Sequence, residues 1–226
     1  MRRVLVSALA AGCLAGLIFF VLQAATLLPL IKAAEGYERA GLMLDHDAGG
    51  WEPADGLERM AYTALADEVT GIGFALLLVG AFSLTRGPMD VRRGLLWGLA
   101  GYAVFSLAPA LGLPPQPPGS VAAGLAARQA WWLGTALATA AGLALLVYRK
   151  PLAVKAAALC LLVLPHVIGA PQPPAMDGST PPELAARFAA TSLVTTAVFW
   201  IVLGISSAWL YERLGRVEHR LPSDGH

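Results

Sequence analysis

Two proline-rich turns with nearly the same sequence place the strongest constraint on how this chain can fold. Residues 106–118 read SLAPALGLPPQPP and residues 162–174 read LVLPHVIGAPQPP, so the two copies lie 56 residues apart. Each turn follows an apolar segment, and a Leu-Ala-Ala-Arg stretch after each turn opens another apolar segment (residues 125–128 and 184–187). An internal repeat indicates a repeated structural unit. The sequence therefore predicts helical hairpins, each built from two apolar helices joined by a proline-containing turn.

Six apolar segments account for most of the chain. Of the 226 residues, 57% are hydrophobic and only 14% are charged, whereas about 25% are charged in an average soluble domain. About 20 helical residues cross the hydrocarbon core of a bilayer. We therefore expect an all-α, polytopic membrane protein, a single integral domain over residues 1–226, with about six transmembrane helices in three hairpin repeats. The predicted segments are 4–31, 57–84, 94–113, 122–148, 152–168 and 184–210.

The repeat extends more faintly to the first two segments. Pro29 lies near the end of the first segment, and residues 53–59 open the second much as residues 182–187 open the sixth. The first segment is too long for a secretory signal, whose apolar core has roughly 7–15 residues. We expect a retained transmembrane helix, in which Gly12-x-x-x-Gly16 provides a face for close helix packing.

Lysine and arginine are distributed unequally between the two sets of predicted loops. Positively charged residues are enriched in short loops on the cytoplasmic side of a membrane. One side holds 11 of the 16, which predicts that both termini, including a polar tail at residues 213–226, are cytoplasmic. An acidic loop at residues 32–56 then faces outward. The 11 residues are Arg2, Arg3, Arg86, Arg92, Arg93, Arg149, Lys150, Lys155, Arg213, Arg216 and Arg220.

The acidic outer loop contains candidate metal ligands. Glu35 and Glu38 are about one helical turn apart and could face the same way. Asp45, His46 and Asp47 place an imidazole between two carboxylates. Nitrogen and oxygen donors of this kind suit divalent first-row metals, and a negative surface attracts hydrated cations. The alternative is an acidic loop that is only solvated.

An acidic residue, Asp67, lies well inside the second apolar segment. An ionised carboxylate in lipid costs on the order of 3 kcal/mol, so such a group normally faces a bundle interior or an aqueous cavity and is a functional-site hypothesis. Thr63 and Thr70 share its helix face at i−4 and i+3, and Thr191 and Thr195 occupy the corresponding face of the sixth segment. The sequence predicts an ion path along these residues. The alternative is a wetted carboxylate at the membrane interface.

A histidine, His166, follows Pro165 at the predicted outer end of the fifth segment. Proline removes a backbone donor and bends the helix, which frees carbonyl groups nearby. A histidine there could bind a metal or carry a proton, or it could be hydrogen-bonded at the interface, and we leave both open. For Arg128 and Arg187, at the starts of the fourth and sixth segments, we favour a role as anchors at the outer headgroups.

Several function classes lack support in the sequence. The chain has no G-x-x-x-x-G-K-[ST] run, no His-Glu-x-x-His motif and no Ser/His/Asp spacing. We expect no enzyme activity, no intrinsic cofactor and, with a net charge of +1, no nucleic-acid partner. Any ATP-driven motor would be another chain.

Six short stretches, spread over nearly the whole chain, together resemble the CbtA family, the predicted cobalt transporter subunit of bacteria. The resemblance implies cobalt uptake for cobalamin synthesis, across a bacterial inner membrane. It also implies a small companion subunit, CbtB, with one transmembrane helix and a histidine-rich end. The stretches are Leu28–Ile31, Ala34–Glu38, Trp51–Arg59, Arg92–Gly101, Leu107–Pro115 and Leu164–Pro171.

The combined hypothesis is a membrane subunit that imports cobalt(II) or a similar divalent metal. The outer residues from Glu35 to Asp47 would collect the hydrated ion, and Asp67 with Thr63 and Thr70, and His166 across the bundle, would pass it inward. Assembly as a homo-oligomer is left open. The alternative is a non-transporting membrane scaffold or regulatory subunit whose acidic loop binds a periplasmic partner.

Overall fold

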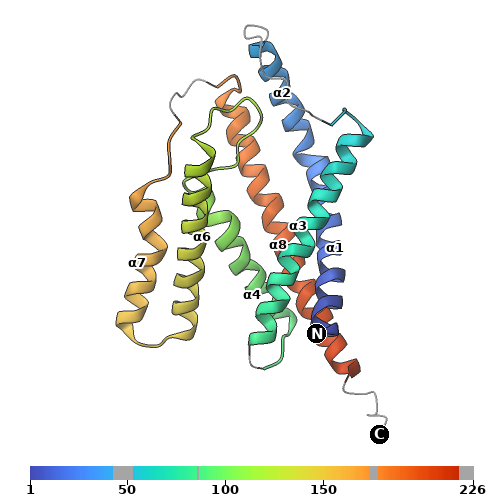
Figure 1. Ribbon diagram of the computed structural model, residues 1–226, viewed down its shortest axis with the longest axis vertical. Coiled ribbons are helices and arrows are strands. Elements are labelled where there is room, and N and C mark those ends of the chain that lie inside the picture. Colours follow the sequence, from blue (N-terminus) through green and yellow to red (C-terminus); the bar gives the residue numbers. More distant parts are fainter. Residues whose placement is uncertain (43–52, 86, 174–177, 219–226) are drawn as a thin grey trace. The chain divides into compact units, whose positions relative to one another are not determined.

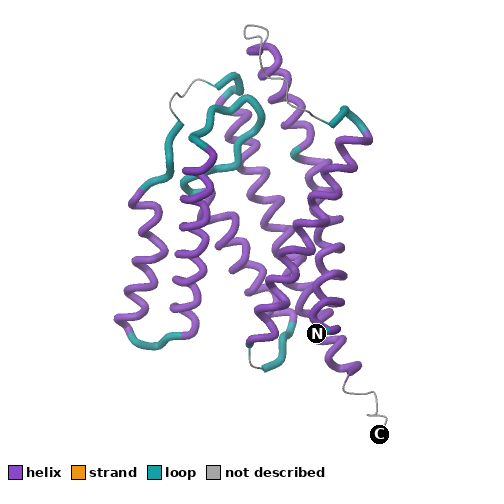
Figure 2. The backbone as a smooth tube through the Cα atoms, in the orientation of Figure 1, coloured by secondary structure: helices purple, strands orange, loops and turns teal. Residues whose placement is uncertain are grey.

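The computed structural model is helical and describes residues 1–42, 53–85, 87–173 and 178–218, among which there is no strand (Figures 1 and 2). The all-α prediction is therefore confirmed. The elements are α1 (Arg2–Thr26), α2 (Leu28–Leu42), α3 (Leu57–Leu84), α4 (Val91–Tyr102), the π-helix η1 (Ala103–Leu107), α5 (Ala108–Ala110), α6 (Leu125–Tyr148), α7 (Leu152–Ile168) and α8 (Pro182–Glu218).

Four of the described helices are long and apolar enough to cross a membrane. They are α1, α3, α6 and the stretch Pro182–Arg216 of α8. Helix α7 is apolar but has only 17 residues. Elements α4, η1 and α5 follow one another without a gap over the third predicted segment. A membrane protein with four candidate spans is thus supported, whereas six spans, three hairpin repeats and cytoplasmic termini stay predictions.

The helix boundaries agree closely with the sequence except near the first segment and at the end of the sixth, where α8 continues to Glu218, eight residues past the predicted end at Leu210 and into the predicted polar tail. Helices α3 and α7 have the predicted bounds. The first predicted segment instead divides at Leu27, which separates α1 from α2. Pro29 lies in the first turn of α2, where its missing N–H breaks no helical hydrogen bond. Because α2 continues to Leu42, the stretch expected to be a loop from residue 32 begins as a helix.

The described residues pack as two compact units. Unit 1 takes its residues from Met1–Ala24, Gly50–Gly101 and Thr195–His226. Unit 2 takes its residues from Ala25–Gly49 and Tyr102–Val194. Unit 1 therefore contains most of α1, all of α3 and most of α4, with the second part of α8. Unit 2 contains α2, η1, α5, α6 and α7, with the first part of α8.

Glycines set the close approach of helices within unit 1. A Cβ added to Gly12 of α1 would lie 2.5 Å from the Cα of Ile72 in α3, and one added to Gly71 would lie 2.5 Å from the Gly12 carbonyl oxygen. The predicted packing face at Gly12-x-x-x-Gly16 is confirmed. Helices α4 and α8 meet in the same way, with Gly98 against Gly204. Small residues let helix backbones touch, which compensates for the weak hydrophobic drive between helices in lipid.

Helix α6 organises unit 2. It packs side by side with α7 (Figure 1), where a Cβ on Gly142 would lie 2.9 Å from the Leu162 side chain. It also contacts η1 and α5, with the rings of Phe105 and Trp132 6.2 Å apart. The contact between η1–α5 and α6 is the one expected within a predicted hairpin. The contact between α6 and α7 instead joins two different predicted hairpins.

Candidate functional site

The strongest candidate site is a buried carboxyl group between α1 and α3 in unit 1. Asp67 lies on α3 and is only 6% exposed. The α1 backbone comes close to it because Gly16 has no side chain: a Cβ there would lie 2.9 Å from the Asp67 carbonyl oxygen. The prediction that Asp67 points away from lipid agrees with this burial. Its carboxyl group is therefore enclosed by helix packing.

Only half of this carboxyl group has a hydrogen-bond partner among the described residues. The Gln23 side-chain amide of α1 donates to Asp67 Oδ1 at 2.7 Å, while Oδ2 is buried and has no partner there. An ionised carboxylate offers about four acceptor positions, and leaving a buried polar group unsatisfied costs about 1–3 kcal/mol, more when it is charged. The arrangement favours a further positive partner at Oδ2, either a proton or a metal cation.

A second carboxyl group lies next to the first along the chain. Glu68 is half-buried and lies beside the thiol of Cys13 on α1. Cys13 is itself exposed, so the buried part of the site is the Asp67 carboxyl group with the Gln23 amide. Glu68 adds a second carboxyl group at the next position of α3. The described part of the chain nevertheless holds no group of three or more His, Cys, Asp and Glu side chains placed to bind a metal. The described donors around Asp67 are therefore too few to make a complete metal site by themselves.

An aromatic cluster occupies the core of unit 1 further along α3. Phe74 is seven residues beyond Asp67, so about 10 Å along the same helix face. Its ring lies 4.8 Å from Trp200 and 6.4 Å from Phe199, and Phe199 lies 4.9 Å from Phe19. Phe199 and Trp200 are fully buried. The face of α3 that holds Asp67 is therefore filled with packed rings at this level.

The other predicted residues of unit 1 differ in their surroundings. The Thr63 hydroxyl donates to the carbonyl of Arg59 at 2.9 Å, a bond within its own helix. Thr70 is exposed. It follows Asp67 by three residues, which rotate the helix by 300°, so its side chain is offset from that of Asp67 around the helix axis. It does not share the buried environment of Asp67. Thr195 is buried in α8.

The remaining predicted site residues belong to unit 2 or lie outside the described residues. Glu35 forms an ion pair with Arg39 at 3.5 Å, and Glu38 lies near Gly119 of the first proline-rich turn. The ring of His166 packs edge-on against Trp131 at 6.0 Å. Thr191 is half-buried in α8. Asp45, His46 and Asp47 lie outside the described residues, so a metal site there stays a prediction.

Sequence reasoning missed one member of the site, Gln23. It is the only amide side chain in the first apolar segment, and polar side chains in transmembrane helices often hydrogen-bond across to a neighbouring helix. The presence of one amide in the first apolar segment and one aspartate inside the second was the sign in the sequence that Gln23 and Asp67 form a hydrogen bond.

Comparison with known proteins identifies the family to which this chain belongs. No curated protein matches the chain, and no solved structure matches it. The family model for CbtA, described as a probable cobalt transporter subunit, matches residues 1–212. The match covers both units and every helix except the end of α8. A chain with four candidate membrane spans among its described helices, a buried carboxyl group on one of them and this match belongs to the CbtA family of probable cobalt transporter subunits.

Proposed function

We propose that the chain is the membrane subunit of a cobalt uptake system linked to cobalamin synthesis. In this proposal Asp67 binds the ion transiently inside the bilayer. The family description names cobalt, and the proposed cargo is cobalt(II) or a similar divalent metal. The half-satisfied, buried carboxyl group of Asp67 carries the proposal, because its free oxygen needs a positive partner. This role is transport and not catalysis.

The sparse donor set fits transport better than storage. An ion in a conduction path must bind well enough to enter and weakly enough to leave. Asp67 with its neighbour Glu68 supplies charge, and Gln23 holds the Asp67 carboxyl in place. The cluster of Phe74, Phe199 and Trp200 would then act as a barrier that rearranges when the ion passes further along α3.

The steps before and after Asp67 extend the proposal to other residues and chains. Glu35 and Glu38 on α2, with Asp45, His46 and Asp47, would collect the ion outside, and His166 would serve as a further ligand. Because the family is a transporter subunit, a partner subunit is implied, and we propose a small CbtB-like chain with one transmembrane helix. The bacterial inner membrane is the proposed location.

Radioactive cobalt uptake in cells tests the role of Asp67. The variant Asp67→Asn keeps the size of the side chain but removes its charge, and we expect uptake to fall about tenfold or more, since interactions with charged groups contribute about 1.5–3 kcal/mol. Glu58→Gln is the matched control, because Glu58 is an exposed acid on the same helix. Its uptake should stay at the wild-type level.

Equal uptake by Asp67→Asn and wild type, at equal amounts of protein in the membrane, would contradict the proposal. In that case the scaffold alternative would replace it. Charge reversal within residues 45–55 would then abolish binding of a periplasmic partner and leave cellular cobalt unchanged.

A further inference from the structure

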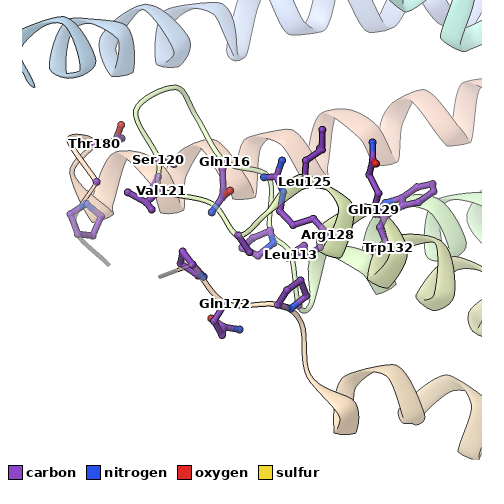
Figure 3. A pocket seen from close by; sticks show the side chains of 18 of the residues that line it. Leu113, Gln116, Ser120, Val121, Leu125, Arg128, Gln129, Trp132, Gln172 and Thr180 are labelled. Carbon is purple, nitrogen blue, oxygen red and sulfur yellow. The ribbon is translucent and has the colours of Figure 1, made fainter. Parts of the chain in front are cut away.

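Unit 2 contains a large cavity that the proposed ion path does not use. Its volume is about 920 Å³, within the range of about 300–1,000 Å³ found for small-molecule sites. The two proline-rich turns form much of its wall, with Gln116 from the first and Gln172 from the second at equivalent positions of the repeat. Figure 3 shows these turns facing the start of α6. The repeat thus builds one shared cavity.

The described residues that line this cavity carry one positive charge and no negative charge. Arg128 is the one charged side chain among its described lining residues, and no acidic residue is among them. Glu38 lies near Gly119, outside this lining. Helix α6 begins at Leu125, on the cavity wall, so its N-terminus adds a partial positive charge. A bare divalent cation would be repelled here, whereas an anion would be attracted.

The guanidinium group of Arg128 has unused hydrogen-bonding capacity. Its Nε atom is buried and has no hydrogen-bond partner among the described residues. The side chain reaches from α6 toward the loop that holds Leu113 and Gln116 (Figure 3). A guanidinium presents five donors in a fork that matches the oxygens of a carboxylate or phosphate. The amides of Gln116 and Gln129 line the same cavity and can add hydrogen bonds.

The rest of the wall is mostly apolar, which constrains the other part of the ligand. Trp132, Leu133 and Val121 line the cavity together with the prolines of both turns. Leu125 and Leu133 are also strongly exposed, as expected for side chains that meet lipid. A ligand that fits this wall has an oxyanion at one end and an apolar body at the other.

We propose that this cavity binds a phosphate oxyanion through Arg128, supplied either by the headgroup of an anionic phospholipid or by a free phosphate. The site lies wholly within unit 2 and is independent of the role of Asp67 in unit 1. Through this site the membrane subunit would bind a second ligand, an anion, in addition to the divalent cation that it transports.

The repeat provides a matched pair of variants for the test. Arg128 and Arg187 end the two Leu-Ala-Ala-Arg stretches, but Arg187 is exposed and is not among the cavity residues. Full-length protein is reconstituted in nanodiscs of phosphatidylcholine containing one fifth phosphatidylglycerol. Lipids that stay bound are then counted by native mass spectrometry. Arg128→Gln should lower retained phosphatidylglycerol by about fivefold or more, and Arg187→Gln should leave it unchanged.

A second arm separates the two sources of phosphate. Inorganic phosphate is added to protein in nanodiscs of phosphatidylcholine alone, and the melting temperature is measured. A phosphate-dependent rise that Arg128→Gln abolishes supports a free phosphate, whereas Arg128-dependent retention in the first arm supports a lipid. If Arg128→Gln does not fold, Arg128→Lys keeps the charge without the fork and should show a smaller loss. The proposal is overturned if neither arm depends on Arg128, or if Arg187→Gln has an equal effect.

Discussion

The contact between α1 and α3 makes Gly71 a sensitive small residue near the candidate site. A Cβ at this position would lie 2.5 Å from the Gly12 carbonyl oxygen and 3.1 Å from the Gly16 amide nitrogen. Both are backbone atoms, so no side-chain rotation can relieve the clash. To reach the 3.4 Å of ordinary contact, the two helices must separate by about 0.9 Å. The variant Gly71→Ala therefore tests the packing directly.

The expected effect has a structural and a functional part. Overpacking costs about 1–3 kcal/mol, which should lower the melting temperature by roughly 2–12 °C. Gly71 is one helical turn from Asp67, so the same separation would lengthen the 2.7 Å bond from Gln23 to Asp67 to about 3.6 Å, which is no longer a hydrogen bond. We expect cobalt uptake to fall together with stability.

Gly73→Ala is the matched control for this experiment. Gly73 lies on the same helix, and an added Cβ there has no neighbour within 4 Å. Both variants gain about 1 kcal/mol of helix propensity, so the difference between them isolates the clash. The measurements are thermal unfolding of purified protein in detergent and cobalt uptake in cells. If Gly71→Ala is as stable and as active as Gly73→Ala, the close packing inferred for α1 and α3 is wrong.

Two further predictions concern side chains that link helices of unit 1. Gln23→Leu removes the donor to Asp67 Oδ1, so we expect about 1–3 kcal/mol lower stability in thermal unfolding and reduced cobalt uptake; unchanged values in both measurements would contradict the pairing. Arg3 stacks on the Tyr211 ring at 3.6 Å and donates to the Tyr211 carbonyl. Arg3→Ala should therefore cost about 1–2 kcal/mol in the same unfolding assay, while Arg2→Ala, at an exposed position, should cost little.

The helices could be predicted from the sequence because their apolar runs are long and end at strong breaking residues. Helix α3 ends before Thr85 and Gly87, and α7 ends before Gly169, which adopts a positive φ of 87°. The division at Leu27 could not be predicted in this way. Apolar residues continue on both sides of it, so hydrophobicity gives no sign of where one helix stops and the next begins.

The candidate site was predicted only in part, because it depends on which helices touch. Asp67 stood out because a charge in an apolar helix needs a special environment. Its partner Gln23 lies 44 residues away, and no periodicity within either helix links the two. Thr70 was included on helical spacing alone, and its exposure shows how narrow the buried face of α3 is. Helix geometry gives a face, but packing decides which part of that face is enclosed.

The two Leu-Ala-Ala-Arg stretches show the same limit for the repeat. Their letters are identical, and the sequence suggested one role, an outer anchor, for both arginines. In the structure Arg128 lines a cavity and has a buried nitrogen, whereas Arg187 is exposed. The difference arises because Arg128 lies in the first turns of α6, which packs against both α7 and η1–α5, and because described residues of both proline-rich turns line the same cavity. A repeated sequence therefore specifies a repeated local structure, while the neighbours that each copy acquires determine its chemistry.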